Sequence, residues 1–202
     1  MSIDLPGLVR WGPFALLVFY AAAFVTGTLR VANESRGPVY VLGADATHRV
    51  SQAAFRLSFA VLLGVFTLRA EWPFLEQVTG PLEWAHSPTV QLLGFVVMLE
   101  GVVVAALAQF QMGQAWRIGV PDREPSQFVE RGLFRFSRNP VFLGMAGIFL
   151  GGLLVAPSAL TLMAASLALF AMSIQIRLEE AHLSSTLGSA YEAYKARVRR
   201  WI

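Results

Sequence analysis

The sequence predicts an all-α polytopic membrane protein with five transmembrane helices, the last two forming a tight hairpin, plus a cytoplasmic C-terminal amphipathic helix. Three observations support this prediction. Of 202 residues, 55% are hydrophobic and 14% are charged, and the mean hydropathy of +0.56 is too high for a water-soluble domain of this size. Apolar stretches long enough to cross a bilayer recur along the chain. The basic residues between them are unevenly distributed.

Three predicted spans lie in the first half of the chain. Residues 11–29 carry no formal charge, residues 51–68 contain Arg56 near one end, and residues 88–111 contain Glu100 near their middle. At 1.5 Å per residue, each stretch approaches or exceeds the roughly 30 Å of a hydrocarbon core. We do not expect residues 11–29 to be a signal peptide, because the segment before them is not basic.

The last two spans share one uncharged stretch. Residues 139–176 contain no Asp, Glu, Lys or Arg, and as a single helix they would extend about 57 Å, nearly twice the hydrocarbon thickness. Pro157 is the expected break, since proline lacks an amide hydrogen and disfavours helix in the preceding residue. The stretch therefore predicts a hairpin of residues 140–156 and 158–176.

The distribution of basic residues predicts the orientation. Thirteen Arg and Lys residues fall in the first and third connections and the tail, against Arg10 and Arg69 at the other end of the spans. The positive-inside rule then places the N-terminus outside and the C-terminus in the cytoplasm. The arginine-rich composition suggests a bacterial cytoplasmic membrane. In the tail, apolar residues recur at helical spacing and predict the amphipathic helix: Leu183, Leu187, Tyr191, Tyr194 and Val198.

Composition also excludes several classes of site. The chain has no cysteine, so it has no disulfide, thiolate metal site or cysteine nucleophile. Its three histidines are scattered, and we expect no metal. The net charge of +3 is too small to indicate nucleic-acid binding. The expected partners are therefore membrane lipids and lipophilic small molecules.

Two segments carry the polar and aromatic residues of a candidate site. The first, residues 113–144, reads Gly-x-x-Trp-Arg and then Gly-x-Phe-Arg-x-x-Arg-Asn-Pro-x-Phe-x-Gly. The second contains the adjacent carboxylates Glu179 and Glu180, where the last span ends. Taken singly, the first also fits an ordinary interfacial loop and the second a solvated helix end.

In this order, with an apolar hairpin between them and Tyr-x-x-Tyr-x-x-Arg-Val-x-Arg after them, the motifs resemble the isoprenylcysteine carboxyl methyltransferase family and its relatives among phospholipid N-methyltransferases. The resemblance extends from about residue 111 to the C-terminus. It implies an integral-membrane enzyme that binds S-adenosylmethionine in a cytoplasm-facing pocket and takes a lipophilic acceptor from the bilayer. We expect one domain, residues 1–202, with an N-terminal two-helix part (1–87) and a catalytic part (88–202).

The resemblance assigns the site residues. Arg138, Asn139 and Glu180 are expected to be catalytic. Asn139 stands where the family has His, and Phe142 where it has Tyr, so these positions lack the family's imidazole and phenol. The expected cofactor-binding residues, some by motif and some by position, are Gln111, Gly113, Trp116, Gly132, Phe134, Arg138, Asn139, Pro140, Phe142, Glu179 and Glu180.

The chemistry of the donor fits these residue types. A sulfonium with an amino acid tail requires carboxylates for its ammonium or ribose hydroxyls, a cation for its carboxylate, and aromatic surface for adenine. A carboxylate acceptor would be oriented by Arg117 or Arg135, whereas an amine acceptor would need a base such as His182 or a Glu. Glu100, near mid-bilayer, is expected either to contact the acceptor or to make a structural polar contact.

Two other functions remain open. A membrane reductase of the sterol or steroid type would bind NADPH in a similar cofactor half, although residues 88–176 contain no tyrosine to donate a proton. A non-catalytic membrane module is the third possibility. The spans lack the broken helices and paired ions that are typical of transporters.

Overall fold

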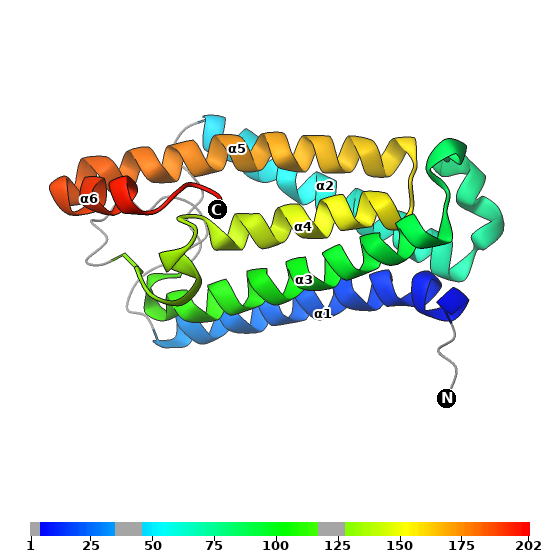
Figure 1. Ribbon diagram of the computed structural model, residues 1–202, viewed down its shortest axis with the longest axis horizontal. Helices are drawn as coiled ribbons and strands as arrows, with labels where there is room; N and C mark the ends of the chain where they lie inside the picture. The colour runs from blue at the N-terminus through cyan, green and yellow to red at the C-terminus, as the bar shows by residue number, and fades with distance from the viewer. Residues whose placement is uncertain (1–4, 35–45, 117–127) are drawn as a thin grey trace.

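The computed structural model describes residues 5–34, 46–116 and 128–202, which are helical apart from short connections. Within these ranges, six α-helices and four 3-10 turns follow one another, and Figure 1 shows their arrangement. They are α1 (Leu5–Glu34), α2 (Ala46–Glu71), η1 (Pro73–Thr79), η2 (Glu83–Ala85), α3 (Pro88–Met112), η3 (Gly113–Ala115), η4 (Gly132–Arg135), α4 (Pro140–Val155), α5 (Ala159–Leu187) and α6 (Ser189–Arg197). No strand occurs in the described ranges, so the all-helical prediction is confirmed.

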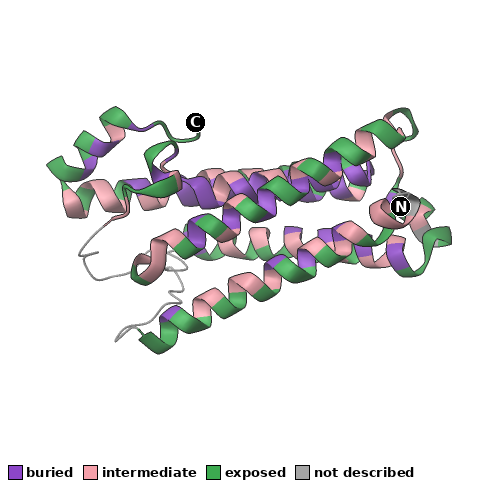
Figure 2. Ribbon diagram, turned by 60° about the horizontal axis from the view of Figure 1, so that its bottom comes forward, coloured by how far each residue is buried: buried purple, intermediate pink, exposed green. Residues whose placement is uncertain are grey.

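In the part of the chain that the structure describes, four helices are long and apolar enough to cross a membrane: α1, α2, α3 and α5. Large apolar side chains on their outer faces are exposed, for example Phe19 at 61% and Phe170 at 64%. Figure 2 shows the buried residues gathered where the helices face one another. An apolar exterior of this kind requires lipid rather than water around it. The helix α4 has 16 residues, about 24 Å, so a fifth span stays a prediction.

The helices α3 and α4 are in close backbone contact. A Cβ added at Gly101 would lie 2.6 Å from the Gly144 carbonyl oxygen, and one added at Gly151 would lie 2.6 Å from the Gly94 carbonyl oxygen. Small residues at such a crossing let two helices approach closely in a membrane, where no hydrophobic effect drives them together. This contact fixes the start of α4, which bears the Arg-Asn-Pro motif.

The chain reverses at Pro157, and α5 returns beside α4 (Figure 1). The side chain of Ser158 accepts a hydrogen bond from Thr161 N while the Thr161 hydroxyl accepts one from Ser158 N, forming a capping box that starts α5. The second connection packs on this turn, since Leu82 N donates to Pro157 O at 2.8 Å. The carbonyl group of the breaking proline is therefore satisfied.

The two arginines at this end of the bundle bind helix C-termini. Arg10 Nε and Nη2 donate to Ala70 O at 2.9 and 2.7 Å, and Arg69 Nη1 donates to Val155 O at 2.6 Å. The last carbonyls of a helix have no partner within it and carry partial negative charge. These arginines therefore tie α1 to α2 and α2 to α4.

The tail differs from the single amphipathic helix predicted from residue 177 onward. Instead, α5 continues without interruption to Leu187, Gly188 adopts φ +54°, and α6 turns back beside the end of α5 (Figure 1). The break follows from Gly188, because this backbone conformation is rarely open to other residues. The predicted apolar stripe is retained across both helices, as Tyr191, Tyr194 and Val198 form a small cluster with Leu183 and Leu187.

Candidate functional site

A cavity of about 370 Å³ lies among the start of α4, the second half of α5, and α6. The volume is in the range that holds cofactors and drug-sized ligands. It is lined from α1, α2 and α3 as well. Eight of the eleven predicted cofactor-binding residues line it: Trp116, Phe134, Arg138, Asn139, Pro140, Phe142, Glu179 and Glu180.

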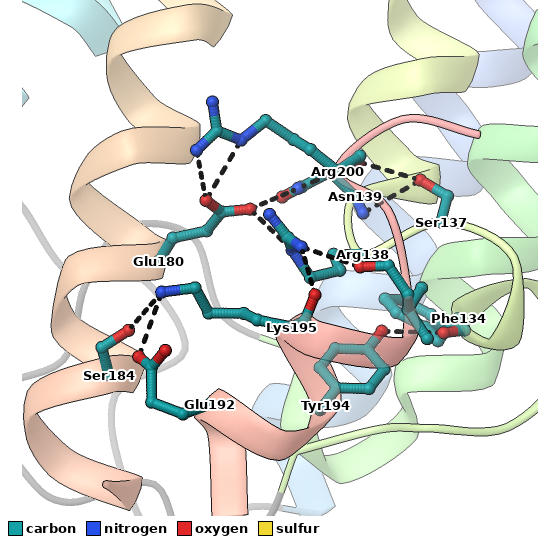
Figure 3. Close-up of polar contacts among 11 residues, drawn as sticks. Phe134, Ser137, Arg138, Asn139, Glu180, Ser184, Glu192, Tyr194, Lys195 and Arg200 are labelled. Atoms are coloured by element: carbon teal, nitrogen blue, oxygen red, sulfur yellow. Dashed lines mark hydrogen bonds and ion pairs between the residues drawn. The ribbon is translucent and has the colours of Figure 1, made fainter. Parts of the chain in front are cut away.

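Glu180 is the centre of a buried polar cluster (Figure 3). Its Oε1 accepts from Arg138 Nε at 3.0 Å and from Asn139 Nδ2 at 3.2 Å, while its Oε2 accepts from Arg200 Nη2 at 2.7 Å. The Glu180 side chain is only 8% exposed, so the charge of this carboxylate is compensated by two guanidinium groups. The hydrogen bond with Glu180 raises the pKa of Arg200.

The C-terminal segment, residues 198–202, is held against the Arg-Asn-Pro motif. Arg138 N donates to Arg199 O at 3.0 Å, and Arg138 Nη1 donates to Val198 O at 2.7 Å. Ser137 Oγ and Asn139 Nδ2 both donate to Arg200 O, at 3.2 and 3.3 Å. Hydrogen bonds therefore join the Arg-Asn-Pro motif both to Glu180, in the acidic doublet Glu179–Glu180, and to the C-terminal segment.

Glu179 faces the same cavity with different partners. Its Oε1 accepts from Gln175 Nε2 at 2.9 Å, one helical turn earlier. Two buried polar atoms on the same wall, Gln175 Oε1 and His182 Nε2, have no hydrogen-bond partner among the described residues. Buried polar groups in proteins are almost always hydrogen-bonded. The unpaired atoms therefore leave hydrogen-bonding capacity for water or a polar ligand on the Gln175, Glu179 and His182 face of α5.

Aromatic side chains also line the cavity. Trp116 is buried, donates from Nε1 to Thr28 Oγ1 at 3.1 Å and packs edge-on against Phe24 with 5.6 Å between ring centroids. Phe134 is fixed by the Tyr194 hydroxyl, which donates to the Phe134 carbonyl oxygen at 2.7 Å. Burial raises the pKa of Tyr194 to about 12, so this donor stays protonated at neutral pH.

Three predicted cofactor-binding residues support the site from outside the cavity lining. Gln111 Oε1 accepts from Leu133 N at 2.8 Å and so ties α3 to η4. Gly132, with φ +61°, lies against the Gln111 side chain, where a Cβ would collide with it. Gly113 ends α3 with φ +50°. These residues shape the backbone beneath the cavity.

The predicted acceptor-binding residues are not brought together. Arg135 is exposed and Glu100 lies on α3 beside a smaller groove, and neither lines the main cavity. Arg117 lies outside the described residues. The roles of Arg135, Glu100 and Arg117 in acceptor binding stay predictions.

The structure adds residues that the sequence analysis did not assign to the site. Gln175 lines the cavity, and so do Ser51, Gln52 and Arg56 of α2. Arg200, the last residue of the Tyr-x-x-Tyr-x-x-Arg-Val-x-Arg motif, binds Glu180. Isolated polar residues in apolar helices belong to no motif, and only the rotation of each helix brings them to the cavity. For Gln175, the sequence offered one signal: its spacing of four residues from Glu179 places both side chains on the same face of a helix.

Among the described residues, no group of three or more His, Asp or Glu side chains is arranged to hold a metal ion.

Comparison with protein families gives one match. The phospholipid methyltransferase family model matches residues 89–190, about half of the chain, from α3 to the first residues of α6. A comparison with curated proteins found no match. The match agrees with the resemblance to phospholipid N-methyltransferases, whereas the narrower one to isoprenylcysteine carboxyl methyltransferases stays a prediction.

Proposed function

Because the chain belongs to the phospholipid methyltransferase family, and is therefore a membrane methyltransferase, we propose that it uses S-adenosylmethionine to methylate a lipophilic acceptor at the cytoplasmic membrane face. The observation that carries this proposal is the convergence of two distant segments on one cavity. The doublet Glu179–Glu180 and the motif at residues 132–142 both line it, and unpaired polar atoms of Gln175 and His182 lie on the same helix as the doublet.

The residues present fit the proposed cofactor. The Glu179 carboxylate and the unpaired Gln175 Oε1 are acceptors suited to an ammonium group or ribose hydroxyls. The rings of Phe134 and Trp116 offer apolar surface for adenine. When bound, S-adenosylmethionine supplies an electrophilic methyl group. Glu180 acts on the cofactor site indirectly, because its hydrogen bonds hold Arg138 and Asn139 in place.

The acceptor proposed first is the carboxylate of a prenylated or fatty substrate, followed by a lipid amine. A carboxylate attacking a sulfonium disperses charge, so an apolar cavity favours that reaction without a general base. The walls formed by Phe55, Met145 and Met172 are apolar and would exclude water. For an amine, the unpaired His182 Nε2 would accept the proton.

We also propose the finer membrane arrangement. In it, α4 is a fifth span that forms a membrane hairpin with α5, the N-terminus lies outside, and the cavity opens to the cytoplasm of a bacterial cell. The two arginines at the opposite end support this orientation, since they bind helix carbonyls there rather than marking a basic cytoplasmic surface.

Calorimetric titration of the detergent-purified protein tests the proposal. We expect S-adenosylhomocysteine to bind and NADPH not to bind. The Glu180→Ala variant should weaken the binding at least about tenfold, or 1.4 kcal/mol. Transfer of radiolabelled methyl groups into a total lipid extract would then identify the acceptor class. Binding of NADPH alone would support the membrane reductase, and binding of neither would overturn the methyltransferase assignment.

A further inference from the structure

Three exposed arginines lie on two neighbouring segments at the end of the bundle that contains the cavity: Arg131, Arg135 and Arg199. The first two belong to residues 131–136, which include η4, and the third to the C-terminal segment. We propose that these two segments form a basic surface that binds the phosphate groups of anionic phospholipids in the surrounding membrane. This inference goes beyond the proposed function, since the lipid bound here contacts the protein surface and is not the methyl acceptor.

Hydrogen bonds hold the two segments of the basic surface next to each other. Arg138 N donates to Arg199 O at 3.0 Å. Ser137 Oγ donates to Arg200 O at 3.2 Å, a contact that Figure 3 shows. The arginines of the C-terminal segment are therefore close to those of residues 131–136, although more than 60 residues separate them in the sequence.

The basic surface lies where the bundle meets the lipid headgroups. Leu133 N donates to Gln111 Oε1 at 2.8 Å, which holds η4 at the end of α3. The helix α3 is long and apolar enough to cross a membrane, so its last turn lies near the boundary between the hydrocarbon and the headgroups. This placement holds for either orientation of the chain in the membrane.

The positive charge of this surface is not compensated by the described residues. Residues 131–136 and 198–202 contain no Asp or Glu. Of their four arginines, Arg200 binds Glu180, whereas the other three make no side-chain hydrogen bond or ion pair with a described residue: Arg131, Arg135 and Arg199. The planar fork of a guanidinium group matches two oxygens of a phosphate. The surface is therefore complementary in charge to a layer of anionic headgroups.

Apolar side chains of the same two segments are also exposed. Phe136 is 70% exposed, Trp201 38% and Ile202 75%. Tryptophan and arginine together are typical of the headgroup region, where an aromatic ring meets the ends of the acyl chains. A small soluble anion would complement only the arginines, whereas a phospholipid complements the arginines and the apolar side chains. We therefore assign a lipid to this surface.

The experiment titrates the full-length protein in dodecyl maltoside with three probes by calorimetry. Dioctanoylphosphatidylglycerol is the anionic lipid, dioctanoylphosphatidylcholine is the zwitterionic reference with the same chains, and inorganic phosphate is an anion without chains. We expect the wild type to bind phosphatidylglycerol about tenfold more tightly than either of the other probes, and high salt should weaken this preference. Equal binding of the two lipids would overturn the basic surface as a lipid site. Equally tight binding of inorganic phosphate would indicate a site for small anions and would overturn it as well.

The double variant Arg135→Gln/Arg199→Gln should reduce the preference for phosphatidylglycerol to about threefold or less. The matched control is Arg30→Gln/Arg197→Gln, which removes the same charge from two exposed arginines that are already held in ion pairs. It should keep the preference of the wild type. If the first double variant loses its helical circular dichroism, its two single variants replace it, and each should lower the preference at least about twofold.

A preference that survives in folded variants of Arg135 and Arg199 would overturn the proposal, and so would an equal loss in the control. The titrations contain no cofactor, so their outcome does not depend on the proposed function.

Discussion

Glu179 and Glu180 are neighbours in sequence with different surroundings. Successive residues on a helix point about 100° apart, so the two carboxylates cannot share one set of partners. Glu180 is held by Arg138, Asn139 and Arg200, whereas Glu179 contacts Gln175 beside the unpaired polar atoms. We infer that Glu180 assembles the site and that Glu179 faces the ligand.

Paired substitutions separate these two roles. Glu180→Gln should lower the free energy of unfolding by about 2–3 kcal/mol, because it leaves Arg138, whose side chain is 10% exposed, without its anion. Glu179→Gln should leave stability nearly unchanged and weaken binding of S-adenosylhomocysteine at least about tenfold. Thermal unfolding in detergent and calorimetry measure the two effects. A destabilised Glu179→Gln beside an unaffected Glu180→Gln would reverse the assignment.

The Tyr194 hydroxyl gives a prediction with a defined pH dependence. At pH 7, Tyr194→Phe should lower the free energy of unfolding by about 1–2 kcal/mol, because the buried Phe134 carbonyl loses its hydrogen-bond donor. Burial raises the pKa of Tyr194 to about 12 in the folded protein, against about 10 in the unfolded chain. The wild type should therefore exceed Tyr194→Phe in free energy of unfolding by the full amount below pH 10. This difference should be lost as the pH rises from about 10 to about 12.

Thermal unfolding of both proteins across this pH range measures the difference. Tyr191→Phe is the control at pH 7, since the Tyr191 hydroxyl has no hydrogen bond among the described residues. It should lower the free energy of unfolding by less than Tyr194→Phe does. A Tyr194→Phe deficit that is absent at pH 7, or that grows above pH 10, would contradict the role of this bond.

The candidate site was predictable from the sequence where motifs carry it. Arg138, Asn139 and Glu180 were identified by the order of motifs, and the structure brings all three into one cluster. Gln175 was not identified, and Arg200 was part of a quoted motif but was not assigned to the site. A glutamine in an apolar helix has no distinguishing neighbours, and the return of the C-terminal segment to the motif is a tertiary contact that local pattern does not encode.

At the scale of the elements, long apolar runs predicted the helices because a bilayer demands internal backbone hydrogen bonding. The tail prediction failed at Gly188, where a helical spacing of apolar residues continues across a backbone break. The apolar stripe was read correctly as a set of residues that pack together. Periodicity reports which residues share a face, and a single glycine conformation decides whether they share one helix.

The contact between α3 and α4 is the element-scale feature most sensitive to substitution. Gly144→Ala should destabilise the protein by about 1–3 kcal/mol, because the added Cβ would lie 2.6 Å from the Gly101 carbonyl oxygen, a backbone atom. Gly64→Ala in α2 is the control, since a Cβ there meets no atom within 4 Å among those described. It should be neutral or stabilising by up to about 1 kcal/mol.

Thermal unfolding of the two variants in the same detergent measures the contrast. Equal stability of Gly144→Ala and Gly64→Ala would show that α3 and α4 separate easily. In that case, the start of α4, and with it the Arg-Asn-Pro motif, would not depend on this packing.

At the scale of the whole molecule, the two ends of the helix bundle differ both in the distribution of basic residues and in the contacts that these residues make. One end contains the cavity, the arginine-bearing motif and the tail, with thirteen basic residues in the connections and tail expected there. At the other end, Arg10 and Arg69 are bound to the carbonyls of Ala70 and Val155. The basic side chains that remain available to anionic lipid and cytoplasm are therefore concentrated around the cavity.

Cysteine labelling tests this orientation directly, because the chain contains no cysteine of its own. Glu83→Cys places an exposed thiol in η2, at the end of the bundle away from the cavity, and Ser189→Cys places one at the start of α6. In intact bacterial cells, a membrane-impermeant maleimide should label Glu83→Cys, whereas Ser189→Cys should react only after permeabilisation. The opposite pattern would put the cavity outside the cell, where S-adenosylmethionine made in the cytoplasm would not reach it, and the proposed reaction would then fail for want of a donor.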